Sequence, residues 1–269
     1  MQIFMERYFL YFAYNGKNYC GWQIQPNGIS VQAKMEESLS LLLRTPIRIT
    51  GGGRTDAGVH ATQMVAHFDS PKNRRETVGL TDKLNRILPA DMRVIAIVPV
   101  KANAHARFDA LSRTYRYFIT HEKNPFYHEL LYRQVHPLDY DLMNEASQIL
   151  LEYTDFTSFS KLHTQVKTNN CQIIKAVWTR ETEEVSIFTI QADRFLRNMV
   201  RAIVGTLLEV GKGKLSLEGF RQVIECKDRG KAGTSVPAHA LFLTHIEYPS
   251  ELFENESNES NEKNTHTVD

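Results

Sequence analysis

The order in which two hydrophobic periods follow one another is the feature that most constrains the fold. Apolar residues alternate over residues 6–14, recur at helical spacing from Ser30 until Pro46, and alternate again over 47–50 and 62–68. A second helical pattern covers residues 80–88, and an apolar stretch at 93–100 follows it. Alternation is typical of strands and the 3.6-residue period of helices. The first 100 residues therefore predict a β-α-β-β-α-β unit.

The second half of the chain repeats this order with a different sequence. Strand patterns occupy residues 113–121, 171–180, 185–193 and 241–248, and helical patterns occupy 139–151, 194–210 and 216–226. The sequence therefore predicts an α+β fold with two ferredoxin-like βαββαβ halves, whose mainly antiparallel sheets join edge to edge. We expect an N-terminal half at 1–103, a C-terminal half at 104–249 and a tail at 250–269.

The charge of the chain is unevenly distributed. The formal net charge is only +1, but the last 20 residues hold six acids and one lysine. The remainder is therefore modestly basic, which is compatible with a polyanionic partner such as RNA. The tail has few apolar residues and repeats the letters NES, a composition typical of disorder.

Cysteine usage and hydropathy favour the cytoplasm. Cys20, Cys171 and Cys226 are odd in number and far apart, which is typical of reduced thiols. No apolar run approaches the roughly 18 residues of a membrane span, and the N-terminal segment alternates as a strand does. No CxxC pair occurs, and we interpret His60 and His67 as a loop and a strand histidine. The sequence thus predicts no metal, no cofactor and no membrane partner.

The stretch GGGRTDAGVH at residues 51–60 lies between two predicted strands. Its glycines predict tight backbone with positive φ values. The spacing of Gly53 and Gly58 resembles that of a phosphate-binding loop, but Val59 and His60 stand where that motif needs Lys and Ser or Thr. An acid, Asp56, remains, held close to Arg54. Asp56 either bonds the amides of a turn or carries chemistry.

Two further stretches combine arginines with apolar residues. In SRTYRYF, Tyr115 and Tyr117 share one strand face with Arg116 on the other, a pattern that serves either base stacking or a core. In DRFLRNMVRAIVG, Arg194, Arg197 and Arg201 follow one another at helical spacing. They form either a solvated basic face or a stripe from which one arginine turns inward to pair with an acid.

Several motifs in order carry a resemblance to one family. They are YNGKNYCGWQIQPNGISVQ, GRTDAGVHA, AHARFDALSRTYRY, DFTSFS, DRFLRNMVRAIVGTLLEVGKGK and SVPAHALFL. Over about residues 8–247 the chain resembles the TruA-type tRNA pseudouridine synthases. The resemblance implies the pseudouridine synthase fold, in which the two halves surround a central active-site cleft.

The resemblance also implies an activity and the residues that perform it. The enzyme would be an isomerase that converts uridine to pseudouridine at tRNA positions 38, 39 and 40 in the anticodon stem-loop, without metal or cofactor. Asp56 matches the catalytic aspartate, which we expect to act as the nucleophile, and Arg201 matches its ion-pair partner. Tyr115 matches the base-stacking tyrosine, and Arg54 an arginine beside the extruded nucleotide. Family members are homodimers that hold each tRNA across both subunits.

Two rival functions come from other classes. A non-catalytic RNA-binding protein with RRM-like halves also uses strand aromatics, but it would show an RNP1 signature, which the sequence lacks. A glycoside-cleaving enzyme would normally need two carboxylates roughly 5–9.5 Å apart. The loop at 51–60 offers one acid.

Overall fold

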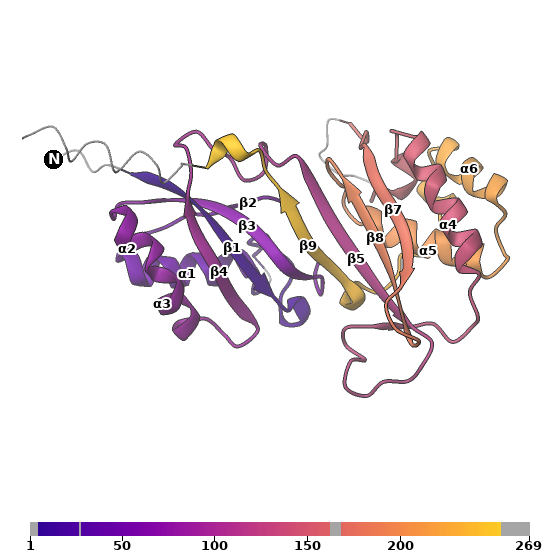
Figure 1. Ribbon diagram of the computed structural model, residues 1–269, viewed down its shortest axis with the longest axis horizontal. Coiled ribbons are helices and arrows are strands. Elements are labelled where there is room, and N and C mark those ends of the chain that lie inside the picture. Colours follow the sequence, from indigo (N-terminus) through magenta and orange to yellow (C-terminus); the bar gives the residue numbers. More distant parts are fainter. Residues whose placement is uncertain (1–4, 27, 162–167, 254–269) are drawn as a thin grey trace, which may run out of the picture.

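A single continuous sheet runs through the molecule, which is described here from a computed structural model covering residues 5–26, 28–161 and 168–253 (Figure 1). The strands follow the order β4-β1-β3-β9-β5-β8-β7, with β2 paired to β3 and β6 paired to β5. Their bounds are β1 Glu6–Tyr14, β2 Thr50–Gly51, β3 His60–Ser70, β4 Met92–Pro99, β5 Ser112–Thr120, β6 Tyr132–Arg133, β7 Ile173–Arg180, β8 Val185–Ala192 and β9 Leu241–Glu247.

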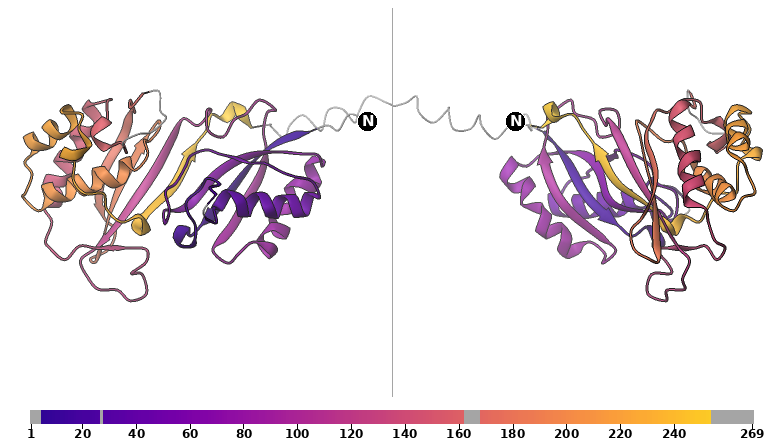
Figure 2. Two further views of the ribbon diagram at one scale, coloured as in Figure 1. Left: turned by 180° about the vertical axis from the view of Figure 1, so that it is seen from behind. Right: turned by 45° about the vertical axis from the view of Figure 1, so that its right-hand side comes forward.

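Helices gather at the two ends of this sheet. The helices α1, α2 and α3 belong to the N-terminal half and α4, α5 and α6 to the C-terminal half (Figure 1). Figure 2 shows from behind that α1 and α5 lie in front of the same face of the sheet. The bounds are α1 Val31–Leu43, α2 Arg74–Val78, α3 Leu80–Ile87, α4 Tyr140–Ile149, α5 Met199–Gly211 and α6 Leu217–Glu225.

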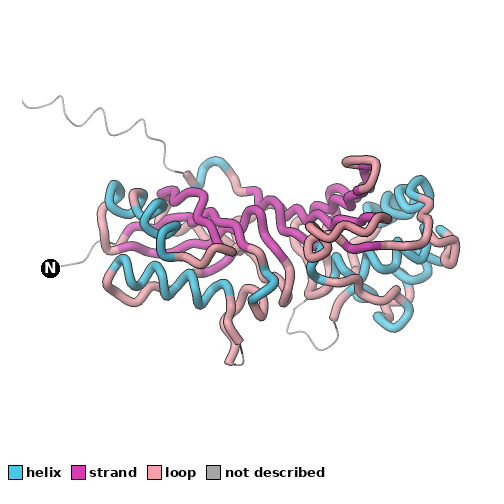
Figure 3. Tube along the Cα trace, turned by 90° about the horizontal axis from the view of Figure 1, so that it is seen from below, coloured by secondary structure: helices cyan, strands magenta, loops and turns pink. Residues whose placement is uncertain are grey.

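Each half has the ferredoxin-like strand order that the sequence predicted. The antiparallel core of the first is β4-β1-β3, and that of the second is β9-β5-β8-β7. The two halves meet where β3 runs parallel to β9, through the pairs His60 with Phe242 and Ala61 with Leu243. Seen from below, the strands form one band along the molecule (Figure 3). The α+β class and the edge-to-edge joining are confirmed.

The strand predicted at residues 47–50 is largely absent. Only Thr50–Gly51 pairs with β3. The Ile47 amide donates to Ser40 Oγ at 2.9 Å, and the Ile49 amide donates to Glu36 Oε1 at 3.1 Å. Side chains of α1 thus take the backbone groups that a strand ladder would have used. Ile47 and Ile49 remain buried, so the apolar pattern reports packing rather than pairing.

The helix predicted from Arg194 begins later. Asn198 adopts a left-handed conformation with φ 66°, and α5 starts at Met199. An L-residue in this region interrupts right-handed helical geometry, so Arg194 and Arg197 belong to the preceding loop. The expected stripe of three arginines on one helix is therefore wrong, because α5 carries only Arg201.

The proposed domain boundary at residues 103 and 104 lies in the segment between β4 and β5. At the other end, residues 250–252 form a 3-10 turn, and Phe253 bridges to Val100. The first four residues of the expected tail are thus attached to the N-terminal half. The rest of that tail, residues 254–269, lies outside the described residues.

Candidate active site

The loop that carries Asp56 connects β2 to β3 and is held from several sides. The Gly52 amide donates to Val65 O at 2.7 Å, and the Trp22 amide donates to Thr55 O at 3.2 Å. The Thr55 hydroxyl lies 2.8 Å from the hydroxyl of Tyr14. Within the loop, the Val59 amide closes a turn on Asp56 O at 3.2 Å. The strand β1 and the segment after it therefore fix the backbone around Asp56.

The glycines of this loop are required mostly by close contacts rather than by φ. A Cβ on Gly51 would lie 2.6 Å from the Trp22 ring, and one on Gly52 would lie 2.6 Å from the Tyr248 hydroxyl. Among Gly51, Gly52, Gly53 and Gly58, only Gly58 has a positive φ, of 78°. The expectation of several positive φ values is therefore wrong. Tertiary neighbours, which the local sequence does not reveal, exclude the side chains.

Asp56 lies between two guanidinium groups. Arg197 Nε is 3.7 Å from Asp56 Oδ1, and Arg201 Nη1 is 3.7 Å from Asp56 Oδ2. The Asp56 side chain is 27% exposed, so the site is open enough for a ligand and closed enough to strengthen the electrostatic interaction. Two cations stabilise the negative charge of this carboxylate.

Arg201 is fixed by backbone on both sides. Its Nε donates to Val236 O at 2.7 Å, and the Val236 amide donates to Arg201 O at 3.2 Å. Because Val236 precedes β9, this pair attaches the first turn of α5 to the segment that enters the junction of the halves. Asp56 of the N-terminal half thereby meets a rigid cation of the C-terminal half.

Tyr115 lies on β5 beside this ion pair. It is 8% exposed, Tyr117 is fully buried and Arg116 is exposed, so the predicted alternation of faces is present. The Tyr115 ring meets Phe195 edge to face, with centroids 5.2 Å apart. Burial, and then the negative charge of Asp56, raise the pKa of the Tyr115 hydroxyl above its usual range. Tyr115 is thus a neutral phenol close to the carboxylate.

Arg54 is exposed and lies among other cations. Burial of part of the side chain, followed by the charges of Arg107 and Arg197, lowers the pKa of its guanidinium. Among the described residues, no carboxylate lies within salt-bridge distance of Arg54 or Arg107. Two like charges, Arg54 and Arg107, that have no acid of their own in the described ranges favour an anionic ligand at this position.

Arg113, also on β5, connects the loop to both halves. Its guanidinium donates to Gly52 O at 2.8 and 3.2 Å, to Asp193 O at 2.6 Å and to Ala110 O at 3.0 Å, and it also reaches Arg107 O at 2.6 Å. A guanidinium presents five donors in a fixed fork, so one side chain can satisfy carbonyls from three segments. Arg113 therefore positions the start of the Asp56 loop.

The two histidines considered as ligands are occupied by hydrogen bonds. His60 Nδ1 accepts from the Gly16 amide at 2.9 Å, so its Nε2 donates to His239 O, also at 2.9 Å. His67 Nδ1 accepts from the Ala106 amide at 3.1 Å. The described ranges contain no group of three His, Cys, Asp or Glu side chains arranged to hold a metal ion. Separately, none of the helices in the described ranges is both long enough and apolar enough to cross a bilayer.

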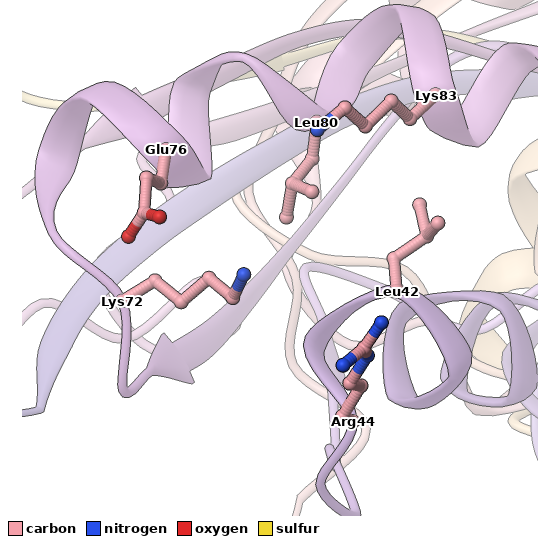
Figure 4. Close-up of a pocket in the computed structure, with 6 residues that line it drawn as sticks. All are labelled: Leu42, Arg44, Lys72, Glu76, Leu80 and Lys83. Atoms are coloured by element: carbon pink, nitrogen blue, oxygen red, sulfur yellow. The ribbon is translucent and has the colours of Figure 1, made fainter.

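A pocket on the helical layer of the N-terminal half is separate from this cluster. It lies between the end of α1 and the helices α2 and α3 (Figure 4). Its lining residues are Leu42, Arg44, Lys72, Glu76, Leu80 and Lys83. The pocket shares no residue with the Asp56 cluster.

Comparison with known proteins identifies the family. The chain is 63% identical to tRNA pseudouridine synthase A of Parabacteroides distasonis over 93% of this chain and 98% of that protein. It is 59% identical to the synthases of the same name from Azobacteroides pseudotrichonymphae, over 93% and 100%, and Bacteroides thetaiotaomicron, over 95% and 96%. The chain belongs to the tRNA pseudouridine synthase A family. A family model described as tRNA pseudouridine synthase also matches residues 146–249.

In this family member, the fold brings three of the four expected site residues into one cluster. Asp56 and Arg201 form the ion pair, and Tyr115 lies close enough for the charge of Asp56 to raise the pKa of its hydroxyl. Arg54 lies at the edge, beside other arginines, and its guanidinium is not within salt-bridge distance of Asp56. Sequence reasoning gave no individual role to Arg197, Arg113 or Phe195. Arg197 was signalled by its place four residues before Arg201, but only the chain reversal at Asn198 reveals why both face the same acid.

Proposed function

We propose that this chain isomerises uridine to pseudouridine at positions 38, 39 and 40 of the tRNA anticodon stem-loop. The relatives' names specify pseudouridine synthesis on tRNA, and the resemblance of the motifs supplies the three positions. The observation that carries the proposal is one carboxylate, Asp56, held between Arg197 and Arg201 beside a buried tyrosine.

The reaction breaks the C1′–N1 bond, rotates the uracil and forms a C1′–C5 bond. The hydrogen at C5 leaves as a proton and N1 gains one, so atoms balance with no electron transfer. Asp56 is the proposed nucleophile, which attacks the nucleotide and is released when the new bond forms. The flanking arginines support this role because each lies 3.7 Å from one oxygen of the carboxylate, which orients it.

The target uridine must leave its stack to meet Asp56. Tyr115 is the proposed surface for the extruded base, and Arg54 is proposed to contact the RNA backbone or occupy the vacated space. Because Tyr115 is 8% exposed and Phe195 packs against it at nearly a right angle, we propose that side chains around Tyr115 move when the base stacks. We therefore expect Tyr115→Phe to keep most turnover and Tyr115→Leu to lose it.

We also propose that the enzyme acts in the cytoplasm as a homodimer, with each tRNA held across two subunits. The three cysteines are free, which is compatible with a reducing compartment. Analytical ultracentrifugation of the full chain, alone and with tRNA, tests this oligomeric state. A monomer that binds and modifies tRNA at full rate would contradict it.

Tritium release from tRNA labelled at uridine C5 tests the activity. Wild type should release tritium from a tRNA with uridine at position 38, 39 or 40, and Asp56→Asn should release none while still folding and binding RNA. The matched control is Asp69→Asn. Asp69 lies on β3, and its carboxylate is also paired with an arginine, at 2.7 Å from Arg7 Nε. Turnover by Asp56→Asn within tenfold of wild type would remove Asp56 from the mechanism.

The runner-up, a non-catalytic RNA-binding protein with RRM-like halves, predicts a different result. Such a protein would bind the stem-loop in a salt-dependent manner and release no tritium. The ion-paired acid at the junction of the halves favours the enzyme, because a neutral or basic surface would serve RNA binding alone equally well.

A further inference from the structure

An exposed aromatic ring lies in the segment between the two halves. Phe108 is 74% exposed, whereas most of the large apolar side chains near the junction are buried. One face of the ring is stacked on His105, with centroids 4.2 Å apart and planes 28° apart. The Arg107 guanidinium carbon lies 5.8 Å from the ring centroid. The ring is thus contacted by His105 and lies close to Arg107, yet most of the side chain stays open to solvent.

The turn that presents this ring, residues 105–109, is extensively hydrogen-bonded. His105 Nδ1 accepts from the amides of Arg107 and Phe108, and the His105 amide donates to Asp109 Oδ2 at 2.7 Å. The Asp109 amide returns a bond to His105 O at 3.0 Å. These hydrogen bonds hold the backbone that presents Phe108 without burying its ring, so the backbone loses little conformational entropy when a ligand stacks on the ring.

Neighbouring elements support the turn from beneath. The His105 ring meets His67 of β3 at a centroid distance of 4.6 Å. The Ala106 amide donates to His67 Nδ1, and Ala106 O accepts from the Tyr248 hydroxyl at 2.5 Å. The turn is thereby attached to the sheet rather than projecting as a free loop.

One side chain connects this turn to the loop of Asp56. Arg113 Nη2 donates to Arg107 O at 2.6 Å and to Gly52 O at 2.8 Å. A single nitrogen therefore bridges the turn of Phe108 and the start of the loop that carries the proposed nucleophile. The distance between the two segments is fixed by two hydrogen bonds.

The electrostatic surroundings identify the chemical class of ligand. Arg54 and Arg107 have no acid within salt-bridge distance among the described residues. A planar ring with unpaired guanidiniums beside it suits a nucleotide, since the base stacks on the ring and the phosphate meets the cations. An apolar protein partner would leave those charges buried without compensation.

We propose that the 105–109 turn is a second nucleotide subsite, in which Phe108 stacks on a base adjacent to the extruded uridine while Arg107 and Arg54 hold the intervening phosphate. This inference rests on the proposed function, because the ligand is the RNA strand that carries the target. Phe108 and Arg107 are binding residues here and take no part in bond exchange. The subsite supports the strand after the target has left the stack.

The test uses the full chain and an anticodon stem-loop with a single target uridine and 2-aminopurine next to it. Stacking on Phe108 should quench the 2-aminopurine fluorescence on binding. Phe108→Leu should restore the emission and raise Kd and KM about tenfold, with kcat within about twofold of wild type, because a stacked base is worth on the order of a factor of ten. Phe108→Tyr should behave as wild type.

Two further variants separate the ring from its surroundings. Leu111→Ala is the matched control, because Leu111 is an exposed apolar residue of the same connecting segment, at 51% exposure. It should change neither Kd nor fluorescence. Arg107→Gln should lower the slope of log Kd against log salt by about one unit, since one phosphate contact is lost.

Unchanged Kd and unchanged quenching in Phe108→Leu would overturn the subsite. Dissociation of a dimer by Phe108→Leu, with wild-type RNA affinity per subunit, would also overturn it and assign the ring to a subunit contact. Absence of tritium release from the wild type would instead overturn the proposed function. The fluorescence and Kd measurements would still decide whether the base stacks on Phe108.

Discussion

A glycine distant in sequence from Asp56 should matter more to catalysis than a glycine next to it. Gly21 has φ 92°, and a Cβ there would lie 2.5 Å from Thr55 O, where ordinary contact begins at 3.4 Å. Gly53 has no positive φ, and a Cβ there would meet nothing within 4 Å. Gly21→Ala should therefore disturb the Asp56 loop, and Gly53→Ala should leave it in place.

The expected magnitudes follow from these distances. The left-handed backbone alone should cost Gly21→Ala about 1–2 kcal/mol of unfolding free energy. Relief of the contact requires the backbone at Thr55, adjacent to Asp56, to move by nearly an ångström. A displacement of about 1 Å in a catalytic group lowers turnover about 10²-fold. We thus expect kcat to fall about a hundredfold for Gly21→Ala and less than about twofold for Gly53→Ala.

Urea unfolding and tritium release from C5-labelled tRNA measure the two effects separately. Both assays are run at a temperature where Gly21→Ala is more than nine-tenths folded, so that lost turnover reports geometry rather than unfolding. Equal losses of kcat in the two variants would refute the argument, as would full turnover by Gly21→Ala. A raised KM with normal kcat in Gly53→Ala would not refute it, because the proposed RNA contact of Arg54 adjoins Gly53.

Three further outcomes are expected. Burial, then the charges of Arg7 and His105, lower the pKa of His67 to about 4 against an opposing effect of Asp69 and Asp109. As pH falls below 6.5, the His67 imidazole of the unfolded chain therefore takes up a proton before that of the folded protein does. The free energy of unfolding should fall by about 2–3 kcal/mol between pH 6.5 and 4, and it should fall less in His67→Asn. Burial raises the pKa of the Cys171 thiol to about 12. Native protein at pH 8 should thus react with a thiol reagent at exposed Cys20 and Cys226 but at Cys171 only after unfolding. Arg113→Lys should lose about 2–3 kcal/mol of unfolding free energy and at least tenfold in kcat, since an ammonium cannot satisfy all the carbonyls that the guanidinium bonds. Wild-type urea midpoint and turnover in Arg113→Lys would contradict the positioning role of Arg113.

Local pattern was sufficient wherever a helix or strand is stabilised by its own periodicity and caps. Ser30 begins α1 through a bond from the Ala33 amide, and Asp139 begins α4 through one from the Leu142 amide, as their types predict. Pattern failed at residues 47–49 and 194–198. In the first case α1 side chains capture the backbone amides, and in the second Asn198 reverses the chain. The spacing of apolar residues along the chain reveals neither feature.

The sequence by itself determined the two βαββαβ halves, the loop with a single acid, and the motifs that mark the family, because these depend on residue type and short-range spacing. Residue type and spacing did not show which charges meet, and the pairing of Arg201 with Asp56 was expected only from the resemblance of the motifs. Asp56 and Arg201 come from different halves and pair at 3.7 Å only because β3 joins β9 in parallel. Arg197 joins them through one left-handed residue, and Arg113 ties the loop to the segment that presents Phe108. Such contacts depend on which distant strands pair with each other, and the residue spacing within one segment does not specify that pairing.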